Sequence, residues 1–159
     1  MDFDVVIIGG GSGGYAAART AQTLGAKVGI VDKGPLGGLC ILRGCMPTKT
    51  ILRSSDVMSL VKRAKEFGLR ASKPIAKMDE IYARKKALVK EFADYRVEQL
   101  NSPRFELIKG KATFLNKNTI QVGKKTITSR SFVIGTGSVV AHFDIPGLSE
   151  VGYITSDEA

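Results

Sequence analysis

Near its start the chain has an apolar run that passes directly into glycines, Val5-Val6-Ile7-Ile8-Gly9-Gly10-Gly11-Ser12-Gly13-Gly14. Continuous β-branched residues are typical of a strand that is buried on both faces of a parallel sheet. The alanine-rich segment from Tyr15 to Leu24 then predicts a helix that ends at Gly25, and Lys27 to Val31 predicts a second strand. Strand, glycine loop, helix and strand in this order indicate an α/β fold with a parallel sheet.

The glycines fit the pattern G-x-G-x-x-G at Gly9, Gly11 and Gly14, and Asp32 closes the second strand. In this pattern the first glycine permits a tight turn, the second lets the backbone approach a pyrophosphate, and the third lets helix and strand pack closely. The helix start offers N–H groups to phosphates, and the acid accepts hydrogen bonds from ribose hydroxyls. We therefore predict a site for FAD or NAD, contacted by Gly9, Gly11, Ser12, Gly13, Gly14, Asp32 and Lys33.

The two cysteines of the chain, Cys40 and Cys45, lie close together in a second glycine-rich segment. In a straight helix their side chains would be about 140° apart around the axis, with a rise of about 7.5 Å. A disulfide needs Cα atoms closer than about 7 Å, so we expect the chain to leave the helical path between them, at Gly44. Pro47 suits a first helical turn. Cys45 would then lie at a helix start, a position that lowers the pKa of a thiol.

Two other roles for the cysteine pair are less consistent with the sequence. A zinc site needs two more ligands, and the single histidine, His142, is remote, so no metal is expected. A purely structural disulfide is unusual in a cytosolic α/β protein. A redox-active pair is the favoured interpretation.

The segment from Gly37 to Lys49, Gly-Gly-Leu-Cys-Ile-Leu-Arg-Gly-Cys-Met-Pro-Thr-Lys, resembles the active-site signature of the pyridine nucleotide-disulfide oxidoreductases. That signature is G-G-x-C-x-x-x-x-C-x-P-[ST]-K, and the resemblance selects FAD as the cofactor beside this loop. It implies that Cys40 exchanges with the substrate, that Cys45 lies against the flavin, and that Lys49 reaches the flavin near its reducible nitrogen. Gly38 is expected among the cofactor contacts.

The same segment departs from the family pattern at two places. Leu39 stands where a threonine usually helps to hold the pyrophosphate, and Leu42-Arg43 replaces a common Asn-Val pair. The chemistry of the cysteines is unaffected, but assignment to a particular member stays open, as does the influence of Arg43 on the substrate that approaches Cys40.

The later part of the chain adds a predicted helical region and a small meander. Residues 54–101 are expected to be helical, with a break near Lys73-Pro74, and short antiparallel strands are expected at Phe105–Phe114, Thr119–Val122 and Lys124–Thr128. Phe132-Val133-Ile134 and the following Gly135 resemble the start of the family's second FAD signature, whose predicted contacts are Thr136, Gly137 and Ser138. Gly110-Lys111-Ala112 resembles the segment that borders the adenine, so Ala112 is a further predicted contact.

Composition and charge exclude several other classes of protein. The net charge is +9, much of it within residues 61–96, but no aromatic-basic interleaving or nucleic-acid motif accompanies it, so no nucleic-acid partner is expected. No run reaches the roughly 18 apolar residues of a membrane span. The acidic start does not resemble a signal peptide, and a cytoplasmic location is expected. His142 lies in a connecting segment and is interpreted as a solvated loop residue, not as a catalytic acid or base.

Taken with the resemblance, residues 1–159 are interpreted as a Rossmann-like FAD-binding domain of the glutathione-reductase type, with a parallel sheet and an antiparallel meander. The NAD(P)H-binding and dimerisation domains are expected to lie outside this chain. The resemblance implies electron transfer between NAD(P)H, FAD, the Cys40–Cys45 pair and a dithiol or disulfide, with dihydrolipoyl dehydrogenase-like activity favoured. Alternatives are a mercuric-ion or other disulfide reductase, or an FAD-binding module without turnover. The parent is expected to be a homodimer and the fragment an inactive monomer; the choice between NADH and NADPH stays open.

Overall fold

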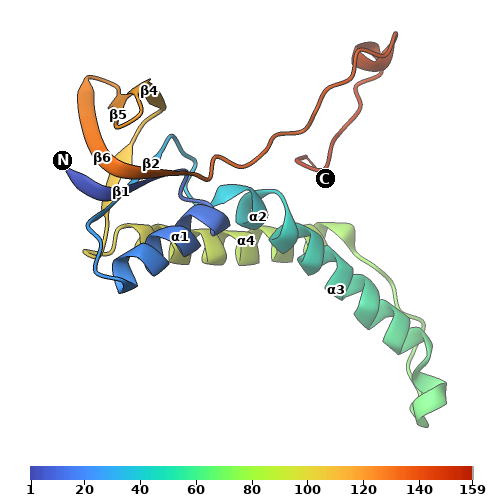
Figure 1. Ribbon diagram of the computed structural model, residues 1–159. Coiled ribbons are helices and arrows are strands. Elements are labelled where there is room, and N and C mark those ends of the chain that lie inside the picture. Colours follow the sequence, from blue (N-terminus) through green and yellow to red (C-terminus); the bar gives the residue numbers. More distant parts are fainter. Residues whose placement is uncertain (159) are drawn as a thin grey trace.

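A computed structural model describes residues 1–158 and contains one six-stranded sheet with the order β3-β2-β1-β6-β5-β4. β1 pairs in parallel with β2 and with β6, and β2 pairs in parallel with β3. The strands β4, β5 and β6 form an antiparallel meander at the other edge (Figure 1). The strands are β1 Phe3–Ile8, β2 Val28–Asp32, β3 Glu106–Lys109, β4 Ala112–Asn116, β5 Thr119–Val122 and β6 Lys125–Ile134. The α/β fold with a parallel sheet and a meander is confirmed.

Side chains of β1 alternate between two hydrophobic clusters, as the period of two in a strand requires. Val6 and Ile8 point to the cluster that includes Ile120 of the meander, whereas Ile7 packs with Tyr15 and Leu100 on the opposite face. The second cluster lies under α1 (Ser12–Thr23) and α4 (Met78–Leu100). Figure 1 shows both helices on one side of the sheet and the meander on the other. The predicted burial of β1 on both faces is confirmed.

The predicted strand Phe105–Phe114 is wrong as a single element, because the chain divides at Gly110. Gly110 has a φ of +150°, and a Cβ there would lie 2.6 Å from Cγ1 of Val122. The first half, β3, joins the parallel sheet beside β2, and only the second half, β4, enters the meander. Local residue preferences predict a strand but do not predict which neighbouring strand it pairs with.

The predicted separation of Lys124–Thr128 from the strand at Phe132 is also wrong. Both belong to β6, which pairs antiparallel with β5 through Lys125–Thr128 and parallel with β1 through Ser129–Ile134. At the change of partner, the buried Ser129 donates its Oγ–H to the carbonyl of Ser131 (2.8 Å), and Asn118 Nδ2 donates to the carbonyl of Ser129 (3.1 Å).

The helical region consists of three α-helices and one 3-10 turn. α2 spans Gly38–Leu42 and α3 spans Cys45–Lys62, followed by the 3-10 turn η1 at Ala64–Phe67. The predicted break is present and wider than expected, since the chain is non-helical from Gly68 to Lys77 before α4 begins. Arg84 Nη1 of α4 donates to the carbonyl of Thr50 in α3 (3.1 Å) and ties the two helices together.

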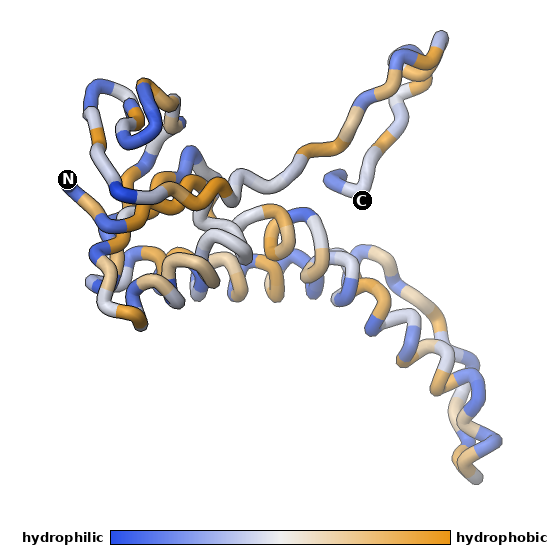
Figure 2. Tube along the Cα trace, in the orientation of Figure 1, coloured by the Kyte–Doolittle hydropathy of each residue, from blue (hydrophilic) through white to orange (hydrophobic). Residues whose placement is uncertain are grey.

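After β6 the chain leaves the sheet as an extended arm that turns at η2 (Leu148–Glu150) and comes back toward α2 (Figure 1). Figure 2 shows hydrophobic residues along the strands and again along this arm, where Val139, Phe143 and Val151 are exposed.

Candidate cofactor cleft and cysteine pair

A cleft of about 310 Å³ lies at the carboxyl ends of the parallel strands β1, β2 and β6. This is the place where open α/β sheets bind ligands. Four parts of the chain meet there: the glycine loop with the end of β2, α2 with the following Arg43, the turn between β3 and β4, and the turn after β6. The predicted contacts that line the cleft are Gly9, Gly11, Asp32, Lys33, Gly38, Ala112, Thr136, Gly137 and Ser138.

Four predicted contacts do not line the cleft: Ser12, Gly13, Gly14 and Lys49. Gly14 instead serves packing, since a Cβ there would lie 1.7 Å from the carbonyl oxygen of Gly9. Lining residues that the sequence did not single out as contacts include Ile8, Val31, Gly34, Pro35, Leu42 and Val139. The strand ends Ile8 and Val31 could have been found from the rule that ligands bind beyond the carboxyl ends of strands; the others carried no signal.

The glycine loop leaves room on its cleft side. A Cβ at Gly11 would meet nothing nearer than Cα of Gly38, at 3.6 Å. α1 begins directly after Gly11, and no side chain caps its first N–H groups. Free helix N–H groups beside open space suit a phosphate. The loop therefore has the room and the N–H donors that a phosphate group needs.

Asp32 holds the loops on both sides of the cleft. Its Oδ2 accepts a hydrogen bond from the N–H of Gly10 and its Oδ1 accepts one from the N–H of Gly34, each at 2.6 Å. A carboxylate has about four acceptor positions, so acceptor capacity for a ribose hydroxyl is left. The sequence predicted only the ribose role, and the clamp between the two loops is an addition from the structure.

The cysteines lie where α2 ends and α3 begins. Arg43 and Gly44 interrupt the helix, Cys45 is the first residue of α3, and Pro47 is in its first turn. The expected departure from a straight helix is confirmed. Cys40 is partly buried and Cys45 is exposed, and both are free thiols. Lys49 is also exposed, one turn after Cys45 on α3.

The expected lowering of the Cys45 pKa is wrong for the reduced pair. A hydrogen bond with the side chain of Cys40, together with desolvation and the charge of Cys40, raises the pKa of Cys45 above its ordinary value. The nearby charge of Lys49 acts in the opposite direction but is weaker. The neighbouring sulfur, which the argument from the helix start left out, therefore determines the direction.

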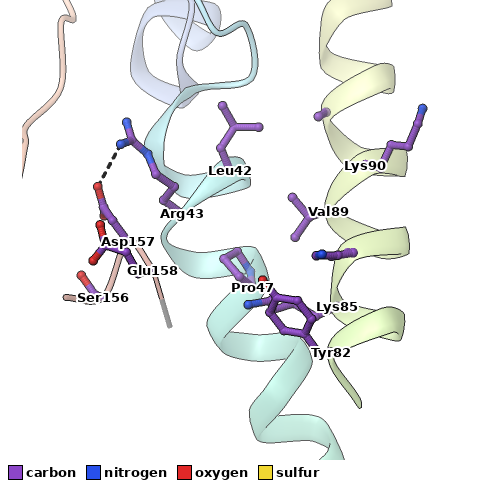
Figure 3. Close-up of a pocket in the computed structure, with 12 residues that line it drawn as sticks. Leu42, Arg43, Pro47, Tyr82, Lys85, Val89, Lys90, Ser156, Asp157 and Glu158 are labelled. Atoms are coloured by element: carbon purple, nitrogen blue, oxygen red, sulfur yellow. Dashed lines mark hydrogen bonds and ion pairs between the residues drawn. The ribbon is translucent and has the colours of Figure 1, made fainter. Parts of the chain in front are cut away.

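A second cavity, of about 290 Å³, adjoins the cysteine turn (Figure 3). Leu42, Arg43 and Pro47 form one wall, residues 82–93 of α4 form another, and the returning arm closes it with Ser156, Asp157 and Glu158. Arg43 Nη1 makes an ion pair with Asp157 Oδ2 at 2.9 Å. Arg43 lines both this cavity and the cofactor cleft.

Three further sequence expectations concern His142, metal ligands and membrane spans. His142 lies on the arm, outside the cleft, and its Nδ1 is 2.8 Å from the hydroxyl of Tyr153. Within residues 1–158 no three His, Cys, Asp or Glu side chains gather as a metal site would require. Over the same residues, none of the helices combines the length and the apolar character that crossing a membrane demands.

The fold and the cleft thus define a Rossmann-like α/β protein with a cysteine pair beside its cleft. Comparison with known proteins agrees, since residues 3–159 match the pyridine nucleotide-disulphide oxidoreductase family. The chain belongs to this family.

Individual relatives cover several activities. The chain is 38% identical to a mercuric reductase of Staphylococcus aureus over 99% of its own length and 29% of that protein. It is 33% identical to a dihydrolipoyl dehydrogenase of Acholeplasma laidlawii (94% and 45%) and 32% identical to a glutathione reductase of Nostoc sp. (99% and 34%). It therefore spans less than half the length of each of these relatives.

Proposed function

We propose that the chain is the FAD-binding portion of an enzyme that passes electrons between NAD(P)H, FAD and the Cys40–Cys45 pair to a disulfide or dithiol substrate. The observation that carries the proposal is the continuity of the two sites. Gly38 and Leu39 line the cofactor cleft, and Cys40 follows in the same short helix. A cofactor seated along this wall would have the cysteine turn at its side.

The residues of the chain divide into binding and exchange roles. The glycine loop would hold the pyrophosphate, Asp32 the ribose, and Thr136 to Ser138 the part of FAD beyond β6. FAD, when bound, supplies a centre that takes up or gives two electrons. Lys49 would favour negative charge near that centre.

The cysteine pair would transfer two electrons to the substrate by thiol–disulfide exchange. Two electrons and two protons convert the Cys40–Cys45 disulfide into two thiols. The thiolate of Cys40 attacks a substrate disulfide and releases one substrate thiol; Cys45 then attacks the mixed disulfide, releases the second thiol and restores the pair. The reverse sequence oxidises a dithiol.

Dihydrolipoyl dehydrogenase-like activity is our first candidate. Mercuric-ion reduction is the second, because the relative at 38% identity carries that name. A homodimeric parent and a reducing, cytosolic compartment, where thiols stay free, are parts of the same proposal. The chain by itself is proposed to be an inactive monomer, without its NAD(P)H partner domain.

One half-reaction tests the proposal without that domain. The chain is loaded with FAD, its cysteine pair is oxidised, and dihydrolipoamide is added without oxygen. Absorbance of the oxidised flavin should fall faster than for free FAD, and Cys40→Ser and Cys45→Ser should both remove the acceleration. Binding of FAD without any acceleration would indicate a cofactor-binding module, and absence of FAD binding would contradict the proposed function itself.

A further inference from the structure

Arg43 is placed to contact the cofactor cleft from the cysteine turn. The residue follows the last residue of α2, and its backbone N–H donates to the carbonyl of Leu39 at 2.9 Å. Leu39 and Arg43 are therefore one helical turn apart, and both line the cleft. Leu39 offers no polar group to a ligand, so Arg43 is the polar side chain of this wall.

The two other cations that line the cleft, Lys33 and Lys111, come from other segments than α2. Lys33 follows β2, and Lys111 lies in the turn between β3 and β4, whose Gly110 N–H donates to the carbonyl of Asp32 at 2.8 Å. Gly11 of the glycine loop is close to Gly38, the first residue of α2. Arg43, which caps the end of α2, is thus the cation on the side of the cleft where Gly38 of α2 approaches the glycine loop.

The present partner of Arg43 is weakly held. In the ion pair the Arg43 side chain is 46% exposed and the Asp157 side chain 16%, and ion pairs open to solvent contribute little stability. Asp157 belongs to the arm that returns after β6. A phosphate, which an arginine fork can bind through two hydrogen bonds, could replace this carboxylate.

We infer that Arg43 is a cofactor-binding residue that exchanges Asp157 for the pyrophosphate of FAD. The inference rests on the proposed FAD binding. Asp157 is then a competitor for the guanidinium, and the two residues have opposite effects on affinity. A purely structural ion pair would give effects in the same direction.

Calorimetric titration of the full 159-residue chain with FAD, ADP and riboflavin tests this. Arg43→Gln should weaken binding of FAD and ADP about tenfold, the loss expected for a charged hydrogen bond, and leave riboflavin unchanged. Asp157→Asn should tighten FAD binding, and the double variant should behave like Arg43→Gln alone. Arg43→Lys should recover part of the affinity.

Lys86→Gln is the matched control, because it removes the same charge from the second cavity, away from the cleft. It should leave FAD affinity unchanged, and circular dichroism should show an intact fold for every variant. Wild-type affinity in Arg43→Gln, or weaker binding in Asp157→Asn, would overturn the inference while FAD binding by the wild-type chain stands. Failure of the wild-type chain to bind either nucleotide would overturn both proposals.

Discussion

Two positions of the same loop, 11 and 14, require glycine for different physical reasons. Gly11 borders open space in the cleft, with the nearest protein atom 3.6 Å from a built Cβ, whereas Gly14 would place a Cβ 1.7 Å from the carbonyl oxygen of Gly9. A methyl group at position 11 would therefore enter the open space of the cleft, and one at position 14 would meet the protein backbone.

Gly11→Ala should weaken FAD binding at least tenfold, or by about 1.4 kcal/mol, and leave the urea unfolding midpoint nearly unchanged. Gly13→Ala is the matched control, since position 13 is in α1, outside the cleft and without a neighbour within 4 Å; its FAD affinity should not change. Gly14→Ala should lower the free energy of unfolding by about 1–3 kcal/mol, as expected for a clash in a packed region. Equal FAD affinity in Gly11→Ala and wild type would contradict the proposed place of the pyrophosphate.

The pKa of Cys45 is a second property set by single residues. Because the hydrogen bond with Cys40 raises this pKa, the thiol stays protonated to a higher pH, and the thiolate that reacts with iodoacetamide is formed later in a pH titration. Cys40→Ala removes the largest cause and should shift alkylation of Cys45 to lower pH. Lys49→Gln should shift it to higher pH, because the lysine charge lowers the pKa. Site-specific mass spectrometry of the reduced protein measures both, and a shift of Cys40→Ala to higher pH would contradict the assignment.

At the scale of elements, β6 joins the two halves of the sheet. One continuous strand changes from an antiparallel partner to a parallel one at Ser129. The amide of Asn118 holds the carbonyl of Ser129 from the turn before β5. The position of the cleft depends on this junction, since Gly135 to Ser138 follow directly from β6.

Asn118→Ala should therefore destabilise the fold by about 1 kcal/mol, the usual net effect of one lost hydrogen bond. Urea denaturation followed by circular dichroism measures this change. Lys117→Ala, at an exposed neighbour on the same turn, should leave the free energy of unfolding within about 0.5 kcal/mol of wild type. If both variants unfold alike, the junction is held by strand pairing alone.

At the scale of the whole molecule, the cleft is small for a dinucleotide. Its volume of about 310 Å³ is at the low end of the roughly 300–1,000 Å³ usual for small-molecule sites, and FAD is a large ligand. The chain also spans only 29% to 45% of the relatives compared above. A cleft of this volume would leave part of a bound FAD exposed to solvent.

The purified chain should accordingly carry much less than one FAD per protein. Absorbance of flavin against protein, before and after incubation with excess FAD and gel filtration, gives the occupancy. Excess FAD should raise it, and filtration should lower it again. A fully loaded yellow monomer that survives filtration would show that this chain holds FAD without further segments.

The sequence by itself predicted the parallel core, the glycine loop, the helix start at Cys45 and the interruption at Gly44, because each depends on neighbours within a few residues. Tertiary structure alone decided the division of β3 from β4 and the shared strand β6, since the choice of a strand partner depends on contacts distant in sequence. It also decided the clamp at Asp32 and the direction of the Cys45 pKa. Both arise from atoms that come together only in the folded chain, so residue patterns do not reveal them.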